Sequence, residues 1–142
     1  MIQHVISNLK FGLTVGVWDL FHAGHANHLR VGVENCDILL VGVTTDYITA
    51  MQKGPQRPGQ TYTTRADSVA RFLDSLPARY VVFSLDTLTL PASLAGVVSI
   101  TFAGPDQLDR FYSHPANNLS PLAIIDRTEG VSTTLLLRDR YS

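Results

Sequence analysis

The sequence predicts an α/β domain in which a mostly parallel β-sheet is sandwiched between helices. Two observations carry this prediction. Short apolar, β-branched runs alternate with amphipathic stretches, and one helical stretch joins the first two runs within about 35 residues. A strand, a helix and a strand in that order form a βαβ unit with parallel strands. With 142 residues, 45% of them hydrophobic and 16% charged, we expect a single domain over residues 1–142 with a buried core.

The first half of the chain gives three elements and a loop. Residues 11–17 (FGLTVGV) are predicted as a buried strand and residues 37–45 (DILLVGVTT) as a second one. Between them, apolar residues recur at the spacing of one helix face. Residues 51–60 (MQKGPQRPGQ) hold two prolines and two glycines, and we predict a loop there.

The second half begins with a helix over residues 61–76, for which Thr63 or Thr64 is the predicted cap. Its apolar face consists of Val69, Phe72, Leu73 and Leu76. The remaining predicted elements are a short strand at 80–83, a helical turn after Pro91, a strand at 97–104, a short helix or loop at 105–118, a last strand at 121–126 and a terminal helix at 132–138.

Composition excludes several classes of function. The formal net charge is −1, whereas binding to a nucleic-acid backbone or to a membrane surface needs a basic surplus. The longest apolar runs are far shorter than the ~20 residues that span a bilayer, and polar breaks in the N-terminal segment argue against a secretory leader. The single Cys36 excludes an intramolecular disulfide and a cysteine-based zinc site, and we predict a buried structural thiol. We therefore expect a cytoplasmic protein without nucleic-acid or membrane partners.

A first cluster of chemically capable side chains follows the first predicted strand. Asp19, His22, Gly24 and His25 fall within seven residues, where a helix begins. Open α/β sheets bind ligands outside the carboxyl ends of their strands, and helix N-termini attract anions. Gly24 permits close backbone approach, and two imidazoles three residues apart can both donate to phosphate oxygens. We interpret the cluster as a phosphate site for group transfer; the alternatives are ordinary capping histidines, or a metal pair that lacks a third ligand.

A second cluster follows the last predicted strand. Residues 127–134 read RTEGVSTT. Arg127 offers a planar, bidentate charge, Gly130 permits an unusual backbone angle, and Ser132 and Thr133 lie where the terminal helix is predicted to start. Hydroxyls and N–H groups at a helix N-terminus would form a second phosphate cradle. The alternative is a plain capped helix.

Together the two clusters resemble a known family. GVWDLFHAGH (16–25) resembles the HxGH signature of the nucleotidyltransferase superfamily in its cytidylyltransferase branch, which includes glycerol-3-phosphate, ethanolamine-phosphate and choline-phosphate cytidylyltransferases. RTEGVSTT resembles the RTEGxSTT signature of that branch. The similarity continues through residues 25–46 and into MQKGP (51–55), which is especially similar to the ethanolamine-phosphate enzymes. It implies a Rossmann-like three-layer sandwich with the HxGH nucleotidyltransferase fold.

The resemblance also implies roles for individual residues. His22, His25, Lys53 and Arg127 would be catalytic and stabilise the transition state. Asp46, Lys53 and Arg65 are implied as acceptor-binding residues, and Asp46 is a helix-cap candidate as well. The implied nucleotide-binding positions are Gly16, Val17, Trp18, Asp19, Gly24, Gly104, Asp106, Arg127, Thr128, Gly130, Val131, Ser132 and Thr133.

The implied activity moves CMP from CTP to a small phosphomonoester and gives a CDP-linked product and pyrophosphate. Ethanolamine phosphate, glycerol 3-phosphate, choline phosphate and a sugar phosphate all remain open as acceptors. Mg²⁺ would accompany the triphosphate, without an assigned protein ligand, and a homodimer is expected from relatives. Two alternatives stay open: an adenylyltransferase of the same fold that uses ATP, and a non-catalytic nucleotide-binding domain.

Two segments depart from the family pattern. Residues 76–82 (LPARYVV) replace a V-D-E-V-like segment, and residues 104–107 (GPDQ) replace a G-D-D-W-like one. We expect both segments near the nucleotide base and the acceptor, where they would affect base choice and acceptor identity. His28, one turn beyond His25, is not expected to line the acceptor side, and core packing accounts for Trp18.

Overall fold

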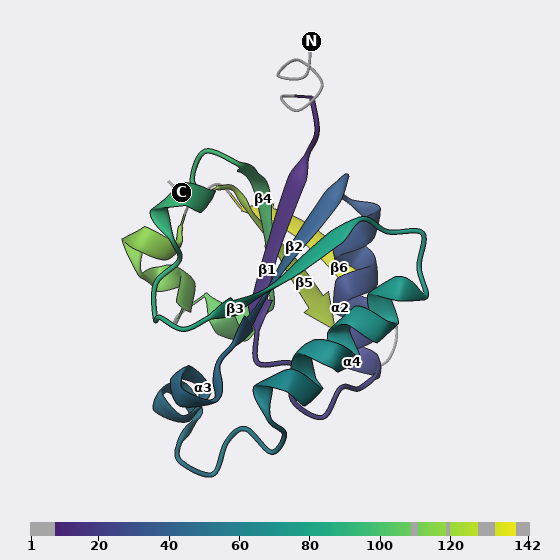
Figure 1. Cartoon of the computed structure of the whole chain (residues 1–142). Coiled ribbons are helices and arrows are strands. Elements are labelled where there is room, and N and C mark those ends of the chain that lie inside the picture. The colour runs from purple at the N-terminus through teal and green to yellow at the C-terminus, as the bar shows by residue number, and fades with distance from the viewer. Residues whose placement is uncertain (1–7, 109–110, 119, 128–132, 139–142) are drawn as a thin grey trace.

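A six-stranded sheet forms the centre of the protein, seen here in a computed structural model that describes residues 8–108, 111–118, 120–127 and 133–138 (Figure 1). Five strands are parallel, and the sixth is antiparallel to its neighbour. In the order β3-β2-β1-β4-β5-β6, the strands are β3 (Tyr80–Leu85), β2 (Ile38–Thr44), β1 (Phe11–Gly16), β4 (Val98–Ala103), β5 (Leu122–Arg127) and β6 (Thr133–Arg138). The predicted Rossmann-like α/β fold with a mostly parallel sheet is confirmed.

Two layers cover the sheet. Helices α2 (Ala23–Glu34) and α4 (Tyr62–Asp74) pack on one face through Leu29, Val69 and Leu73, all fully buried. The other face is covered by the segments that contain the short 3₁₀ turns η1 (Ala92–Leu94), η2 (Pro105–Gln107), η3 (Phe111–Ser113) and η4 (Pro115–Asn117). The predicted apolar face of the second helix is thus confirmed.

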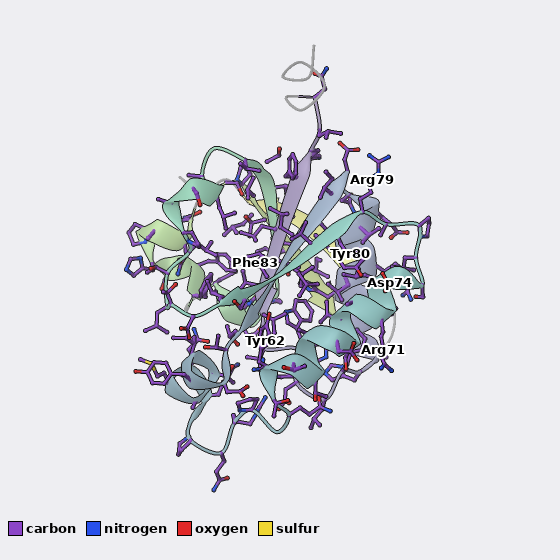
Figure 2. The ribbon with its side chains drawn as sticks, in the orientation of Figure 1. Tyr62, Arg71, Asp74, Arg79, Tyr80 and Phe83 are labelled. Carbon is purple, nitrogen blue, oxygen red and sulfur yellow. The ribbon has the colours of Figure 1, made fainter. Side chains whose placement is uncertain are left out.

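The join between α4 and the sheet also has a polar contact. Figure 2 shows Asp74, at the end of α4, beside Tyr80 at the start of β3, and the Tyr80 hydroxyl donates to the Asp74 carboxylate. This contact raises the pKa of Tyr80, because the hydroxyl proton is shared with a carboxylate. It fixes the amino end of β3 against the end of α4.

The connections create a switch point between β1 and β4. The chain builds outward from β1 through β2 to β3, then crosses back and starts β4 on the other side of β1. The paired register of β1 and β4 ends at Leu13 and Thr101, although both strands continue beyond these residues. The strands therefore part at their carboxyl ends, which is where such sheets bind ligands.

The predicted terminal helix is wrong. Residues 133–138 form strand β6, which pairs antiparallel with β5 from Thr133 opposite Arg127 to Arg138 opposite Leu122. Six residues are fewer than two helical turns, whereas pairing along the open edge of β5 satisfies backbone groups on both strands. A short run of threonine and leucine is compatible with either structure, and the available edge decides it.

Helix boundaries also differ from the prediction. Thr61, not Thr63 or Thr64, caps α4, with its Oγ1 accepting from the Thr64 N–H at 3.4 Å. Helix α3 (Asp46–Lys53) extends three residues into the predicted loop and ends at Gly54, whose φ of 104° disfavours other residues. No helix among the described residues is long and apolar enough to cross a membrane.

Candidate nucleotide-binding site

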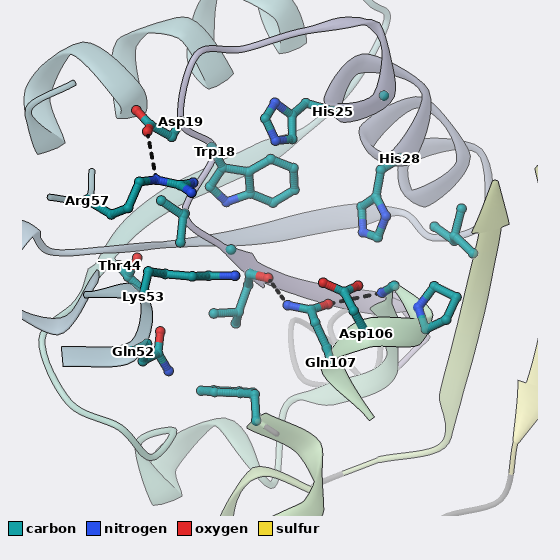
Figure 3. A pocket seen from close by; sticks show the side chains of 18 of the residues that line it. Trp18, Asp19, His25, His28, Thr44, Gln52, Lys53, Arg57, Asp106 and Gln107 are labelled. Atoms are coloured by element: carbon teal, nitrogen blue, oxygen red, sulfur yellow. Dashed lines mark hydrogen bonds and ion pairs between the residues drawn. The ribbon is translucent and has the colours of Figure 1, made fainter. Parts of the chain in front are cut away.

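A cavity of about 580 Å³ opens at the carboxyl ends of β1 and β4 (Figure 3). Its wall is built from the end of β1, the turn into α2, the end of β2 and the segment after β4. Helix α3 and the following loop close one side. Among the predicted residues, those that line it are Gly16, Val17, Trp18, Asp19, His22, Gly24, His25, Lys53, Gly104 and Asp106.

His22 and His25 form a reciprocal cap at the start of α2. The His22 Nδ1 accepts the Gly24 N–H at 3.0 Å, and the His25 Nδ1 accepts the His22 N–H at 3.3 Å. The two rings stack with their centroids 3.9 Å apart. The expectation that both imidazoles lie on one side of the helix start is confirmed. Both histidines also cap the helix, which is the alternative role that the sequence left open.

This cap fixes the tautomer of both rings. An Nδ1 that accepts a backbone N–H cannot carry a proton, so each neutral ring carries its proton on Nε2. The imidazole donors are therefore Nε2–H groups at a helix N-terminus, where the helix dipole already favours anions. Capping and phosphate binding are compatible, because they use opposite nitrogens of the same ring.

Trp18 shapes the turn between β1 and α2. Its ring is buried, its Nε1 donates to the Gly42 carbonyl at 3.0 Å, and its edge packs on His25 and His28 with centroids 5.6 and 5.8 Å apart. Its φ is 57°, in the left-handed region that side chains rarely adopt. The expected packing role is confirmed, and the same ring also supports the imidazoles of the site.

Asp19 ties this turn to the loop that follows α3. Its buried carboxylate accepts the Gly59 N–H at 2.7 Å and the Gln60 N–H at 3.0 Å, and it lies 3.5 Å from the Arg57 Nε. Burial by itself raises the pKa of this carboxyl, but the two N–H donors and the charges of Arg57 and Arg65 outweigh it and lower the pKa. Asp19 is therefore an anion that holds a loop in place.

One side of the cavity is rich in donors. Thr44 ends β2, Gln52 and Lys53 end α3, and Arg57 follows in the loop. Figure 3 shows the Lys53 and Arg57 side chains entering from the same side. Lys53 is the last residue of α3 and does not lie in a loop, because the helix extends into the predicted loop.

Gln107 fills the gap where β1 and β4 part. Its Nε2 donates to the Val15 carbonyl at 2.9 Å, and its Oε1 accepts the Gly104 N–H at 3.0 Å (Figure 3). The side-chain amide thus satisfies backbone groups that no longer pair between the two strands. The GPDQ departure lies in the cavity wall, where Asp106 is exposed. Its expected place near the base and the acceptor stays a prediction.

His28 also lines the cavity, and the expectation that it does not line the acceptor side stays a prediction. Its Nε2 is 2.9 Å from the Thr14 Oγ1. It lies one helical turn beyond His25, so the helix places its ring on the same face. Figure 3 shows it on the opposite side of the cavity from Lys53, near Asp106 and Gln107.

Arg65 and Asp46 are not among the residues that line the cavity. The fully buried Arg65 donates from Nε to the Gln60 carbonyl, and at 2.7 Å to both the Val17 carbonyl and the Asp46 carboxylate. Asp46 is the first residue of α3, and Thr45 is the cap in its place. The pair ties the end of β1 to α3 and α4.

The second predicted cluster lies mostly outside the described residues. Arg127 is the last residue of β5 and Thr133 the first of β6, while Thr128, Gly130, Val131 and Ser132 are not described. Because residues 133–138 form a strand, the helix N-terminus expected at Ser132 and Thr133 is wrong. The predicted roles of Arg127 and of its neighbours stay predictions.

The LPARYVV departure is not near the cavity, which corrects our expectation. Pro77, Ala78 and Arg79 line a second, smaller cavity of about 270 Å³ together with Cys36 and Leu39. Leu39 lies near the amino end of β2, whereas Thr44 at its carboxyl end lines the first cavity. The two cavities therefore lie at opposite ends of the sheet.

Several lining residues were missed from the sequence. Asn117 is buried and holds two loops together, since it accepts from the Leu90 N–H and donates to the Leu88 and Phe111 carbonyls. No local pattern marks it, because two of its three partners, Leu88 and Leu90, lie 29 and 27 residues away in the sequence. Thr44 alone had a signal, its place at a strand end. Pro105 and Gln107 belong to the GPDQ segment that was expected near the site. The missed lining residues are Val15, Thr44, Gln52, Leu88, Phe111, His114, Asn117 and Ile125.

The described residues contain no group of three His, Cys, Asp or Glu side chains that could hold a metal ion. The histidines of the cavity instead have backbone, hydroxyl or ring partners. In this part of the chain, the site is built from donors suited to anions.

A parallel sheet with a donor-lined cavity at its switch point defines a Rossmann-like domain. Comparison with known proteins gives the family: the profile described as "Cytidylyltransferase-like" matches residues 13–138. The chain belongs to this cytidylyltransferase-like family.

Curated relatives agree with this assignment. The chain is 35% identical over 127 residues to the ethanolamine-phosphate cytidylyltransferase of Dictyostelium discoideum, covering 86% of this chain and 34% of that protein. It is 45% identical over 62 residues to the bifunctional protein HldE of Caulobacter sp. (strain K31), covering 44% and 13%. The chain thus spans about a third or less of the length of these relatives.

Solved structures show the same fold. The lipopolysaccharide core biosynthesis protein from Thermoplasma volcanium GSS1 aligns with a TM-score of 0.59 at 19% identity, covering 87% of this chain and all of that one. A protein of unknown function from Archaeoglobus fulgidus aligns with a TM-score of 0.54 at 16% identity, covering 92% and 97%.

Proposed function

We propose that this protein transfers CMP from CTP to a small phosphomonoester. The observation that carries the proposal is the pair of capping imidazoles, His22 and His25, whose tautomer puts both proton donors on Nε2 at a helix N-terminus beside the switch point. Membership of the cytidylyltransferase-like family supports CTP as the donor, and the ethanolamine-phosphate relative supports a phosphomonoester as the acceptor.

In the proposed reaction, an oxygen of the acceptor phosphate attacks the α-phosphorus of CTP. The bond from the α-phosphorus to the oxygen that bridges to the β-phosphorus breaks, and pyrophosphate leaves with that electron pair. Negative charge builds on the oxygens around phosphorus, so catalysis consists mainly of positioning and of charge stabilisation. His22 and His25 would supply hydrogen bonds, and Lys53 would supply a positive charge from the opposite side.

Mg²⁺ is proposed to enter with the triphosphate. A divalent ion neutralises phosphate charge and orients the leaving group. Among the acidic residues that line the described cavity, Asp106 is the candidate ligand for this ion, because its carboxylate is exposed. The Asp19 carboxylate instead accepts the Gly59 and Gln60 N–H groups.

The test is pyrophosphate release from CTP with Mg²⁺ over a panel of acceptors: ethanolamine phosphate, choline phosphate, glycerol 3-phosphate and sugar phosphates. ATP replaces CTP in a parallel series. We expect release that depends on both CTP and one acceptor. Release with ATP only would make the protein an adenylyltransferase, and CTP binding without turnover on any acceptor would make it a binding domain.

A further inference from the structure

The loop after α3 is fastened to the turn between β1 and α2. The two oxygens of Asp19 accept the Gly59 and Gln60 N–H groups, and the Gln60 side chain accepts the Leu20 N–H at 3.0 Å. These contacts join segments about 40 residues apart in the chain. They give the loop a defined position relative to His22 and His25, which follow Asp19 directly.

Arg57 is the residue of that loop whose side chain extends into the cavity. Its Nε faces the Asp19 carboxylate at 3.5 Å, and this contact leaves the two terminal guanidinium nitrogens for other partners. No contact recorded for the described residues occupies these two nitrogens. The side chain is 49% exposed and lines the cavity, on the same side as Lys53.

The acceptor phosphate needs positive charge at this place. In-line displacement puts the attacking phosphate on the side of the α-phosphorus opposite the leaving pyrophosphate. Pyrophosphate suits the α2 N-terminus, with its helix dipole and its two imidazole donors. The attacking phosphate then comes from the α3 side, where its repulsion with the triphosphate has to be offset by cations.

We propose that Arg57 holds the acceptor phosphate and that Asp19 is its positioning residue. This inference rests on the proposed function and names the residue that selects phosphate-bearing acceptors. Arginine suits the task, since its planar fork binds two phosphate oxygens at once and stays charged. Asp19 acts through Arg57 and the loop, and it does not touch the acceptor.

The experiment measures ligand affinity from thermal stabilisation of the full chain. CTP with Mg²⁺ is titrated first, and inorganic phosphate is then titrated at saturating CTP as a probe of the acceptor subsite. For Arg57→Gln we expect phosphate affinity to fall about tenfold or more, while CTP affinity stays within about twofold. Arg57→Lys keeps the charge and should recover part of the loss.

The matched control is Arg71→Gln. Arg71 also pairs through Nε with a carboxylate, that of Asp67 at 2.8 Å, but it lies on α4, is 80% exposed and does not line the cavity. Asp19→Asn should weaken phosphate binding about threefold or more alone and add little in the Arg57→Gln background, because both changes act on one interaction.

Equal phosphate affinity in the Arg57→Gln and Arg71→Gln proteins overturns the proposal, as does an equal loss of CTP and phosphate affinity in Arg57→Gln. The failure of the proposed function looks different: the wild-type chain then shows no stabilisation by CTP, or binds CTP without releasing pyrophosphate on any acceptor. In that event phosphate is titrated without CTP, and the same comparison of the two variants decides the role of Arg57.

Discussion

The two ends of the central sheet differ in chemistry, although the same strand β2 runs between them. At the carboxyl end, the larger cavity gathers imidazoles, Lys53 and Arg57. At the amino end, the smaller cavity holds a half-buried thiol, and Asp37 there accepts the backbone N–H of Lys10. Helix N-termini and the turns that follow strands lie at the carboxyl end, so the fold favours anion binding at that end of the sheet.

The two departures from the family pattern lie at different ends of the sheet. GPDQ lies in the wall of the larger cavity, where Gln107 bridges β1 and the segment after β4. LPARYVV lies at the other end, beside Cys36. Changes in residues 104–107 can therefore alter what the site binds, whereas those in residues 76–82 alter packing.

The largest effect should come from the imidazoles. His25→Ala removes one Nε2–H donor and the acceptor for the His22 N–H, so we expect kcat/KM for CTP-dependent pyrophosphate release to fall roughly 100- to 1000-fold. His22→Ala should behave similarly, because the two rings cap and stack on each other. Activity within about threefold of wild type in either variant would remove these residues from the mechanism.

Asp19→Asn should lower stability in a pH-dependent way. Because the folded-state pKa of Asp19 lies below its unfolded value, its carboxylate stabilises the fold above about pH 4, and this contribution is lost as pH falls through the folded-state pKa. The substitution should cost about 1–2 kcal/mol at pH 7 and less toward pH 3. Urea unfolding at both pH values checks this. A loss of stability that does not depend on pH would argue against a charged Asp19 carboxylate that holds the loop.

Gln107→Ala should weaken nucleotide binding more mildly. The substitution leaves the Val15 carbonyl and the Gly104 N–H without their side-chain partner, which we expect to loosen the switch point. CTP affinity should fall up to about tenfold by calorimetry. Arg79→Gln, in the departure at the amino end, is the matched change and should leave CTP affinity as it is.

Cys36→Ala should have the smallest effect. Burial raises the pKa of the Cys36 thiol to about 11, and its Sγ donates to the Gly32 carbonyl, so the group is protonated at neutral pH. We expect unchanged kinetics and slow alkylation at pH 7 that speeds up above pH 9. Rapid alkylation at pH 7 with loss of activity would indicate a functional role for Cys36 at the amino end of the sheet.

Much of this organisation was readable from the sequence because it is local. The strand, turn and helix around His22 and His25 are continuous in the chain, and their capping uses residues two and three positions apart. The strand of residues 133–138 was not predictable in the same way, since its pairing partner β5 decides between helix and strand. Local propensity does not contain that information.

The residues that complete the site around the imidazoles were harder to predict. Gln107, Asn117 and Arg57 take their roles from contacts made across 27 to 92 residues of sequence. Arg65 shows the converse: its motif suggested an acceptor contact, while its guanidinium is engaged by the Val17 and Gln60 carbonyls and by Asp46. Spacing along the chain indicates where a helix begins, but not which buried group an arginine meets.

The most direct test of the account is an NMR titration of the ¹⁵N-labelled chain with CTP and Mg²⁺. Binding at the carboxyl end predicts progressive amide shifts for Gly16 to His25 and for Gly104 to Gln107, while Cys36, Asp37 and Arg79 stay unchanged. Shifts centred on Cys36 and Arg79, or none at the β1–α2 turn, would contradict the assignment of the nucleotide site to the switch point of the sheet.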